Sequence, residues 1–204
     1  MPRVKIKRKS TVTDMTAMCD VAFLLLTFFI LTAKPKAEEP VPVDTPNSSV
    51  TIKLPETNIA TLVVGSGKVF YDITGAKVRV QALEQMGSKY GITFTDAEKR
   101  RYSNLQAVGV PMNQMKQYLD LESDKAEAYK QPGIPTDSVS NELFNWIRES
   151  RIANVALNNQ EMRLSIKGNS KEEYPTIKKV IDILQKQKVN KFSLITSLKQ
   201  APKK

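Results

Sequence analysis

The side chains that could do chemistry in this chain gather in one apolar stretch near its N-terminus. Within DMTAMCDVAFLLLTFFILTAK, residues 14–34, the carboxylate of Asp20 stands inside a run of apolar residues. Because consecutive residues of an α-helix are turned by 100°, three threonines project within about 40° of this carboxylate. They are Thr13, Thr16 and Thr27. The spacing predicts a polar stripe along one side of an apolar helix.

Asp20 is the residue for which these surroundings favour a specific chemistry. A charged carboxylate near the centre of a membrane helix costs about 2.5–3.5 kcal/mol on insertion scales, and a single span has no second helix to cover it. Because such surroundings disfavour the charged form, the group can take up and release a proton. We therefore expect Asp20 to carry protons in a passage enclosed by other proteins. The alternative is that it reaches the lipid headgroups, while the threonines bond to their own helix.

A membrane-spanning helix, residues 15–33, is the element that must position Asp20. Nineteen residues cover about 28 Å as an α-helix, close to the hydrocarbon thickness of about 30 Å. Five Lys or Arg fall within the first nine residues, so the positive-inside rule places a cytoplasmic tail at residues 1–14 and the rest of the chain outside. A secretory signal peptide is the alternative, but Leu31 stands where cleavage sites have a small residue.

Residues 34–56 predict an extended linker. Four prolines between residues 34 and 46 favour polyproline-type chain of about 3 Å per residue, which holds a following domain away from the membrane. A short β-prone segment follows, from Val50 to Leu54, and it ends at Pro55. This segment alone is typical of an edge strand.

Residues 57–204 predict a small α+β domain. The segments IATLVV and KVFYDI flank Gly65-Ser66-Gly67, which indicates a β-hairpin. Strands are expected at 163–168 and 191–196, on either side of an amphipathic helix, so the C-terminal part is a βαβ unit with parallel strands. Another amphipathic helix is predicted over residues 137–152, with Trp146 in the core or at an interface.

Residues 83–135 are expected to be an insertion in this domain. Thr95 followed by Glu98 is a capping-box pattern, which predicts the start of one helix. Pro111 predicts the start of a second helix. An apolar stripe on this second helix favours burial in the core, with a docking surface as the alternative; it consists of Met112, Met115 and Leu119.

Composition argues against an enzyme. The chain has no histidine, and its one cysteine, Cys19, lies in the predicted span, so the commonest general base and metal ligand, and any Cys-based zinc site, are missing. We expect no cofactor and no metal. The net charge is +10, of which residues 34–204 carry +7. An acidic partner such as peptidoglycan fits this charge, whereas nucleic acid does not fit an extracytoplasmic domain without a reading motif.

The stretch VTDMTAMCDVAFLLLTFFILT resembles the transmembrane signature of the ExbD/TolR biopolymer-transport family. Thr16 and Asp20 fall on the threonine and the essential aspartate of its T-P-h-h-D pattern, and Ala17 stands where many members have proline. The resemblance covers residues 1–82 and 137–198 in all, and it is strongest at the membrane anchor and looser in the soluble domain. Within the linker, a V/I-x-L-P element of the family matches Ile52, Leu54 and Pro55.

The resemblance implies a non-enzymatic subunit of a motor driven by the proton-motive force in the bacterial inner membrane, with a cytoplasmic N-terminus and a periplasmic domain. It implies that the helices of two copies sit inside a pentamer of a multi-helix ExbB- or TolQ-like protein. It further implies that Ile52, Leu54 and Pro55 pair with a strand of the chain itself or of a TonB-like protein.

Three functions stay open at this point. The first is an ExbD-like role in energising TonB-dependent outer-membrane transport, and the second is a TolR-like role in the Tol-Pal system of envelope integrity. The third is a passive membrane tether whose outer domain binds cell wall or protein. Proton rather than sodium coupling is implied by the family and by the single carboxylate.

Overall fold

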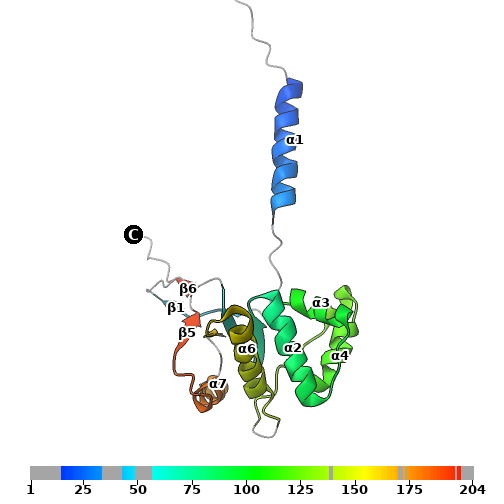
Figure 1. The fold of residues 1–204 in the computed structure, drawn as a ribbon. Coiled ribbons are helices and arrows are strands. Elements are labelled where there is room, and N and C mark those ends of the chain that lie inside the picture. Colours follow the sequence, from blue (N-terminus) through cyan, green and yellow to red (C-terminus); the bar gives the residue numbers. More distant parts are fainter. Residues whose placement is uncertain are drawn as a thin grey trace, which may run out of the picture. The chain divides into compact units, whose positions relative to one another are not determined.

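The chain forms two compact units, Met1–Ala37 and Glu38–Lys204. The computed structural model describes residues 15–33, 43–48, 57–137, 140–169, 172, 174–195 and 197–198. The first unit contains helix α1 (Met15–Thr32), and the second contains the remaining elements (Figure 1). The predicted fold class, one apolar helix followed by an α+β domain, is confirmed.

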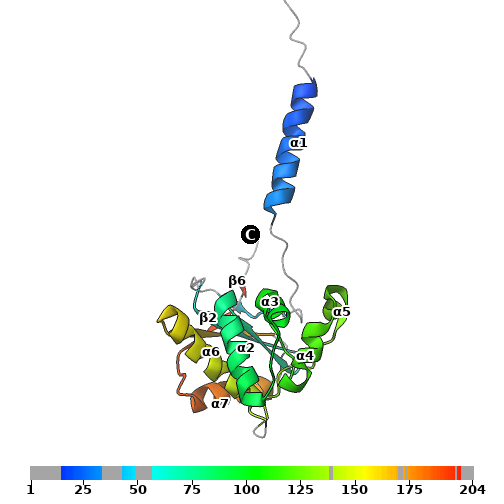
Figure 2. The same ribbon diagram turned by 45° about the vertical axis from the view of Figure 1, so that its right-hand side comes forward.

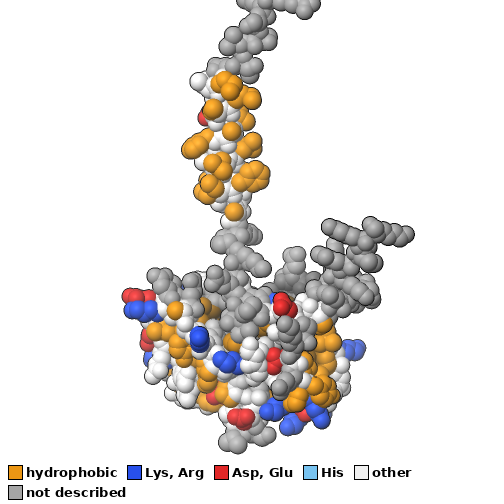
Figure 3. All heavy atoms as spheres, turned by 180° about the vertical axis from the view of Figure 1, so that it is seen from behind, with side chains coloured by type: hydrophobic (Ala, Val, Ile, Leu, Met, Phe, Trp, Pro, Cys, Tyr) orange, Lys and Arg blue, Asp and Glu red, His pale blue; other side chains and the backbone are white. Residues whose placement is uncertain are grey.

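Helix α1 begins at the predicted residue and ends one residue before the predicted boundary. It is apolar over most of its surface, with a mean hydropathy of 2.0 and no buried residue. Figure 3 shows hydrophobic side chains over most of the visible face of this helix. A helix that is hydrophobic over most of its surface and yet exposed needs lipid or other helices around it. Its length and composition suit a membrane span.

A four-stranded sheet lies at the centre of the second unit, in the order β3-β2-β4-β5. The strands are β2 (Ile59–Gly65), β3 (Lys68–Ile73), β4 (Arg163–Gly168) and β5 (Phe192–Ile195). β2 pairs antiparallel with β3 and parallel with β4, and β4 pairs parallel with β5. The predicted hairpin and the predicted parallel pair are both confirmed. The pairing of β2 with β4 joins them into one sheet, and it brings together residues 104 positions apart, such as Thr61 and Ser165.

The turn between β2 and β3 explains why the hairpin forms here. Gly65 pairs with Lys68, so the loop has two residues, Ser66 and Gly67, with φ of 55° and 72°. Two positive φ values are those of the tight turn whose twist matches that of paired strands. Gly67 adopts this backbone without strain because it has no Cβ.

Three helices pack on one face of the sheet: α2 (Ala76–Tyr90), α6 (Glu142–Asn158) and α7 (Tyr174–Lys186). Figures 1 and 2 show α2 and α6 running side by side. Helix α7 buries Val180 and Leu184 on the apolar face that its sequence predicts. Helix α6 begins five residues later than predicted and ends six residues later. Helix α2 has no counterpart among the predicted elements, and Leu83, the expected start of the insertion, lies buried in its middle.

Three shorter helices follow α2 and precede α6 along the chain: α3 (Asp96–Asn104), α4 (Met112–Asp120) and α5 (Ser123–Ala128). Helix α3 starts at the predicted capping box of Thr95 and Glu98. The loops around these helices close the outer edge of β3. Tyr71 exchanges two backbone hydrogen bonds with Val108, and the N–H of Ile134 donates to the carbonyl of Val69. The segment therefore caps one edge of the sheet.

The hydrophobic core shows the roles of the methionine stripe and of the tryptophan. Met112, Met115 and Leu119 are at most 2% exposed, so the core interpretation of this stripe is confirmed. Trp146 is 1% exposed and stacks on Tyr102, with ring centroids 5.9 Å apart. The tryptophan is a core residue.

A short parallel pair lies outside the main sheet. β1 (Asn47–Ser48) pairs with β6 (Ser197–Leu198). The linker predicted over residues 34–56 is therefore tied to the C-terminal part of the unit at these two residues. The strand predicted from Val50 to Leu54 lies outside the described residues.

Candidate functional site

Asp20 lies well inside helix α1. It is the sixth of the helix's eighteen residues, which places it about 8 Å from the first residue and about 5 Å from the helix midpoint. When the helix is centred in a hydrocarbon layer of about 30 Å, the carboxylate lies about 10 Å from the nearer surface. A carboxymethyl side chain is too short to cover that distance. This depth argues against the alternative in which Asp20 reaches the headgroups.

The carboxylate of Asp20 has no partner in the part of the chain that the structure describes. Its side chain is exposed, and no hydrogen bond or ion pair to another described residue is formed. An unpaired carboxylate in lipid costs several kcal/mol unless other groups solvate it. Its partners must therefore come from outside this helix, from water or from other proteins.

Two threonines of α1 use their hydroxyl groups to bond to the backbone of their own helix. The hydroxyl of Thr27 donates to the backbone carbonyl of Leu24 at 2.9 Å, and that of Thr32 donates to the carbonyl of Phe28 at 2.8 Å. This bonding to the helix's own backbone is what the alternative interpretation expected of the threonines. The Thr27 oxygen keeps lone pairs that can accept a hydrogen bond, but its proton is occupied.

The structure describes only part of the predicted polar stripe, and leucine interrupts that part. Thr16 lies one helical turn before Asp20, whereas Thr13 lies outside the described residues. Leu24 and Leu31 also project within about 40° of the Asp20 side chain, and the sequence analysis overlooked them. The described polar groups on this face are thus Thr16, Asp20 and Thr27, interrupted by leucine. Such a face can offer one proton-binding group with acceptors near it, rather than a continuous chain of donors.

The residues predicted to bind a partner strand are Ile52, Leu54 and Pro55. All three lie outside the described residues, so their role stays a prediction. The structure describes the chain again from Thr57, immediately before β2.

The comparisons with known proteins agree with the arrangement of an apolar helix followed by a mixed domain. Neither the search of curated proteins nor the search of solved structures gave a match. The family model described as biopolymer transport protein ExbD/TolR matches residues 7–199, which include α1 with Asp20 and every described element of the second unit. With nearly its whole length covered by that model, from the acid-bearing helix to the last described strand, the chain belongs to the ExbD/TolR family.

Proposed function

We propose that this protein is a non-enzymatic subunit of a proton-driven inner-membrane motor, in which Asp20 carries the protons and the motor energises TonB-dependent transport at the outer membrane. The observation that carries the proposal is the carboxylate of Asp20, which is unpaired by any described residue and lies deep in an apolar helix. The family's association with biopolymer transport supports the same role.

The proton-motive force supplies enough energy for this site to do work. One elementary charge that crosses the membrane gains about 2.3 kcal/mol per 100 mV. A carboxyl group that alternates between neutral and charged forms changes its solvation at each step, so it can favour two different arrangements of the helix in turn. Asp20 is thus the element that converts proton passage into movement of the chain.

The orientation follows from the charges that flank α1. The first nine residues contain five Lys or Arg, and these favour the cytoplasmic side. The second unit is then periplasmic, where it can contact partners of the outer membrane or the cell wall. A single-pass protein of the inner membrane is consistent with the family and with the one candidate span found among the described residues.

The unpaired acid also requires partners. Proteins of this family work with ExbB/TolQ-type membrane proteins, and a ring of such helices would enclose Asp20 and supply the groups that solvate it. A second copy of the chain inside the ring, and a TonB-like protein in the periplasm, complete the proposed assembly.

A substitution at Asp20 tests the proposal in cells that lack their own copy of the protein. Asp20→Asn keeps the size and the polarity of the side chain but cannot ionise, so we expect TonB-dependent uptake to be lost while membrane level and co-purifying partners stay normal. Thr32→Val is the matched control, because Thr32 projects about 120° away from Asp20 and its hydroxyl bonds to its own helix, and it should retain uptake. If Asp20→Asn supports normal uptake, the span is a passive tether and the proposal is wrong.

A further inference from the structure

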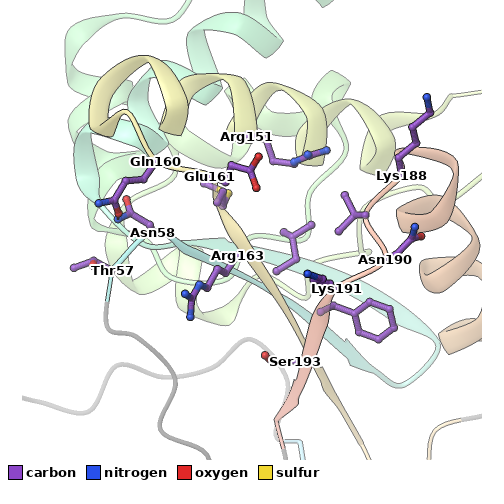
Figure 4. A pocket seen from close by; sticks show the side chains of 14 residues that line it. Thr57, Asn58, Arg151, Gln160, Glu161, Arg163, Lys188, Asn190, Lys191 and Ser193 are labelled. Atoms are coloured by element: carbon purple, nitrogen blue, oxygen red, sulfur yellow. The ribbon is translucent and has the colours of Figure 1, made fainter.

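A groove of about 1080 Å³ opens on the second unit, at the N-terminal ends of strands β4 and β5 (Figure 4). Its walls come from separate parts of the chain: Asn58 before β2, the C-terminal half of α6 with the loop after it, and the loop that joins α7 to β5. This groove has no part in the proposed role of Asp20, and no sequence motif indicates it.

The groove is strongly cationic. Four basic side chains line it, and Glu161 is the one acidic residue among the lining residues; the four are Arg151, Arg163, Lys188 and Lys191. Arg151 and Lys191 approach the space from opposite walls, while Arg163 and Lys188 stand at its rim (Figure 4). None of the four forms an ion pair with a described residue.

Some basic residues elsewhere on this unit do have acidic partners. Arg79 pairs with Asp72, and Lys99 pairs with Glu84 at 2.8 Å. With four basic side chains and one carboxylate, that of Glu161, the groove keeps a net positive charge, and low-dielectric walls concentrate its field. A ligand with two or more carboxylates would neutralise this charge and bind with charge-assisted hydrogen bonds.

Part of the groove's floor is apolar. Met162 and Leu164 are 6% and 2% exposed, and Phe192 lies beside them on the same face of the sheet. Two exposed apolar side chains continue this surface: Val155, one helical turn beyond Arg151, and Leu194, two residues beyond Phe192, are 46% and 63% exposed. A ligand made of charged groups alone would leave the exposed side chains of Val155 and Leu194 in water.

We propose that this groove binds an extended acidic segment of a partner protein, in which carboxylates alternate with apolar side chains. The carboxylates pair with Arg151 and Lys191, and the apolar side chains cover Val155, Leu194 and the floor. An anionic polysaccharide matches the charge but offers no apolar groups for this surface, so a peptide fits better. The inference does not rest on the role of Asp20.

Binding of short labelled peptides to the full-length protein in detergent tests the inference. The probe is a ten-residue peptide of alternating Glu and Val, read by fluorescence anisotropy, and the matched peptide alternates Gln and Val. We expect the Glu peptide to bind about tenfold more tightly, since it alone makes charge-assisted contacts, and its affinity to fall as salt is added. Equal affinities for the two peptides would overturn the proposal.

Paired variants separate the groove from general surface charge. The double variant Arg151→Gln/Lys191→Gln should weaken binding of the Glu peptide about tenfold. The control Lys77→Gln/Lys130→Gln removes the same charge at exposed sites outside the groove and should change the affinity less than twofold. If both variants weaken binding equally, the site is not the groove. If alginate, a carboxylate polysaccharide, displaces the peptide at equal carboxylate concentration, the peptide assignment is wrong.

Discussion

Glu142 shows how the surroundings of a single carboxyl group set its charge in the second unit. It lies in the first turn of α6, is 8% exposed, and accepts a hydrogen bond from the N–H of Met112 at 3.0 Å. Burial raises the pKa of Glu142, and the hydrogen bond from Met112 offsets this only in part. The carboxyl group joins the first turns of α4 and α6, and burial makes its ionised form more costly in the folded protein than in the unfolded chain.

Replacing Glu142 by glutamine should stabilise the protein at neutral pH. A raised pKa in the folded state means that Glu142 contributes stability below the ordinary pKa of a glutamate, and that this contribution is lost as the pH rises through the raised value. Glutamine keeps the acceptor for Met112 and never ionises. We expect Glu142→Gln to melt a few degrees above the wild type at pH 7, and the difference to vanish at acidic pH, as measured by thermal unfolding.

Glu98 provides a control of opposite sign. Burial alone would raise the pKa of Glu98, but hydrogen bonds from the backbone and the side chain of Thr95 lower it overall. Its contribution is therefore present at neutral pH and is lost as the pH falls through the lowered value. Glu98→Gln should melt below the wild type at pH 7. If both glutamine variants shift in the same direction, the account of these two carboxyl groups is wrong.

At the scale of elements, the loop at Gly109 attaches the segment before α4 to the sheet. Phe70 of β3 is fully buried, and it packs with Val63 and Ala107 on the face opposite α2 and α6. A Cβ placed on Gly109 would overlap the ring of Phe70. The carbonyl of Gly109 also accepts a hydrogen bond from the N–H of Gly133 at 2.7 Å, so the loop has little room to move away.

Gly109→Ala should therefore lower the free energy of unfolding by about 1–3 kcal/mol, the usual cost of adding a methyl group to a packed interior. Denaturant unfolding of the detergent-solubilised protein measures this cost. Gly168→Ala is the matched control, since its added Cβ would meet Ile177 at an ordinary 3.7 Å. Equal stability of the two variants would show that the loop does not pack on Phe70.

The elements that the sequence predicted well have local signals. The hairpin follows from Gly65-Ser66-Gly67 between two β-prone segments, and α3 follows from Thr95 with Glu98. Helix α2 was missed because it starts after Gly75 without a side-chain cap and carries only a few apolar residues on its buried face. The pairing of β2 with β4 was also missed, because it is non-local and no pattern within either strand specifies its neighbour.

Of the two candidate sites, Asp20 has a local signal in the sequence and the basic groove has none. Asp20 was found because one charge in an apolar run stands out in any single window of sequence. The basic groove was not found, because Arg151, Arg163 and Lys191 come from different segments that only the fold brings together. Thr27 shows a further limit of sequence reasoning, since its spacing predicted the face it occupies but not the bond that its hydroxyl makes to Leu24.

At the scale of the whole molecule, the two units divide the proposed work. In the proposal, the first unit carries the acid that responds to the membrane potential. The second unit has its own hydrophobic core, formed by residues between Ala60 and Leu184. The second unit can therefore stay folded while the helix moves. In the proposed motor, proton binding at Asp20 changes how α1 sits among its partners, and the folded second unit delivers that change to proteins outside the membrane.

The central claim is that Asp20 gains and loses a proton within the assembled complex. Infrared difference spectroscopy of the protein with its co-purified membrane partner, recorded between alkaline and acidic pH, measures this directly. We predict a band from a protonated carboxyl group in a low-polarity environment, present in the wild type and in Thr32→Val but absent from Asp20→Asn. An identical difference spectrum in Asp20→Asn would show that Asp20 does not exchange a proton, and would contradict the account.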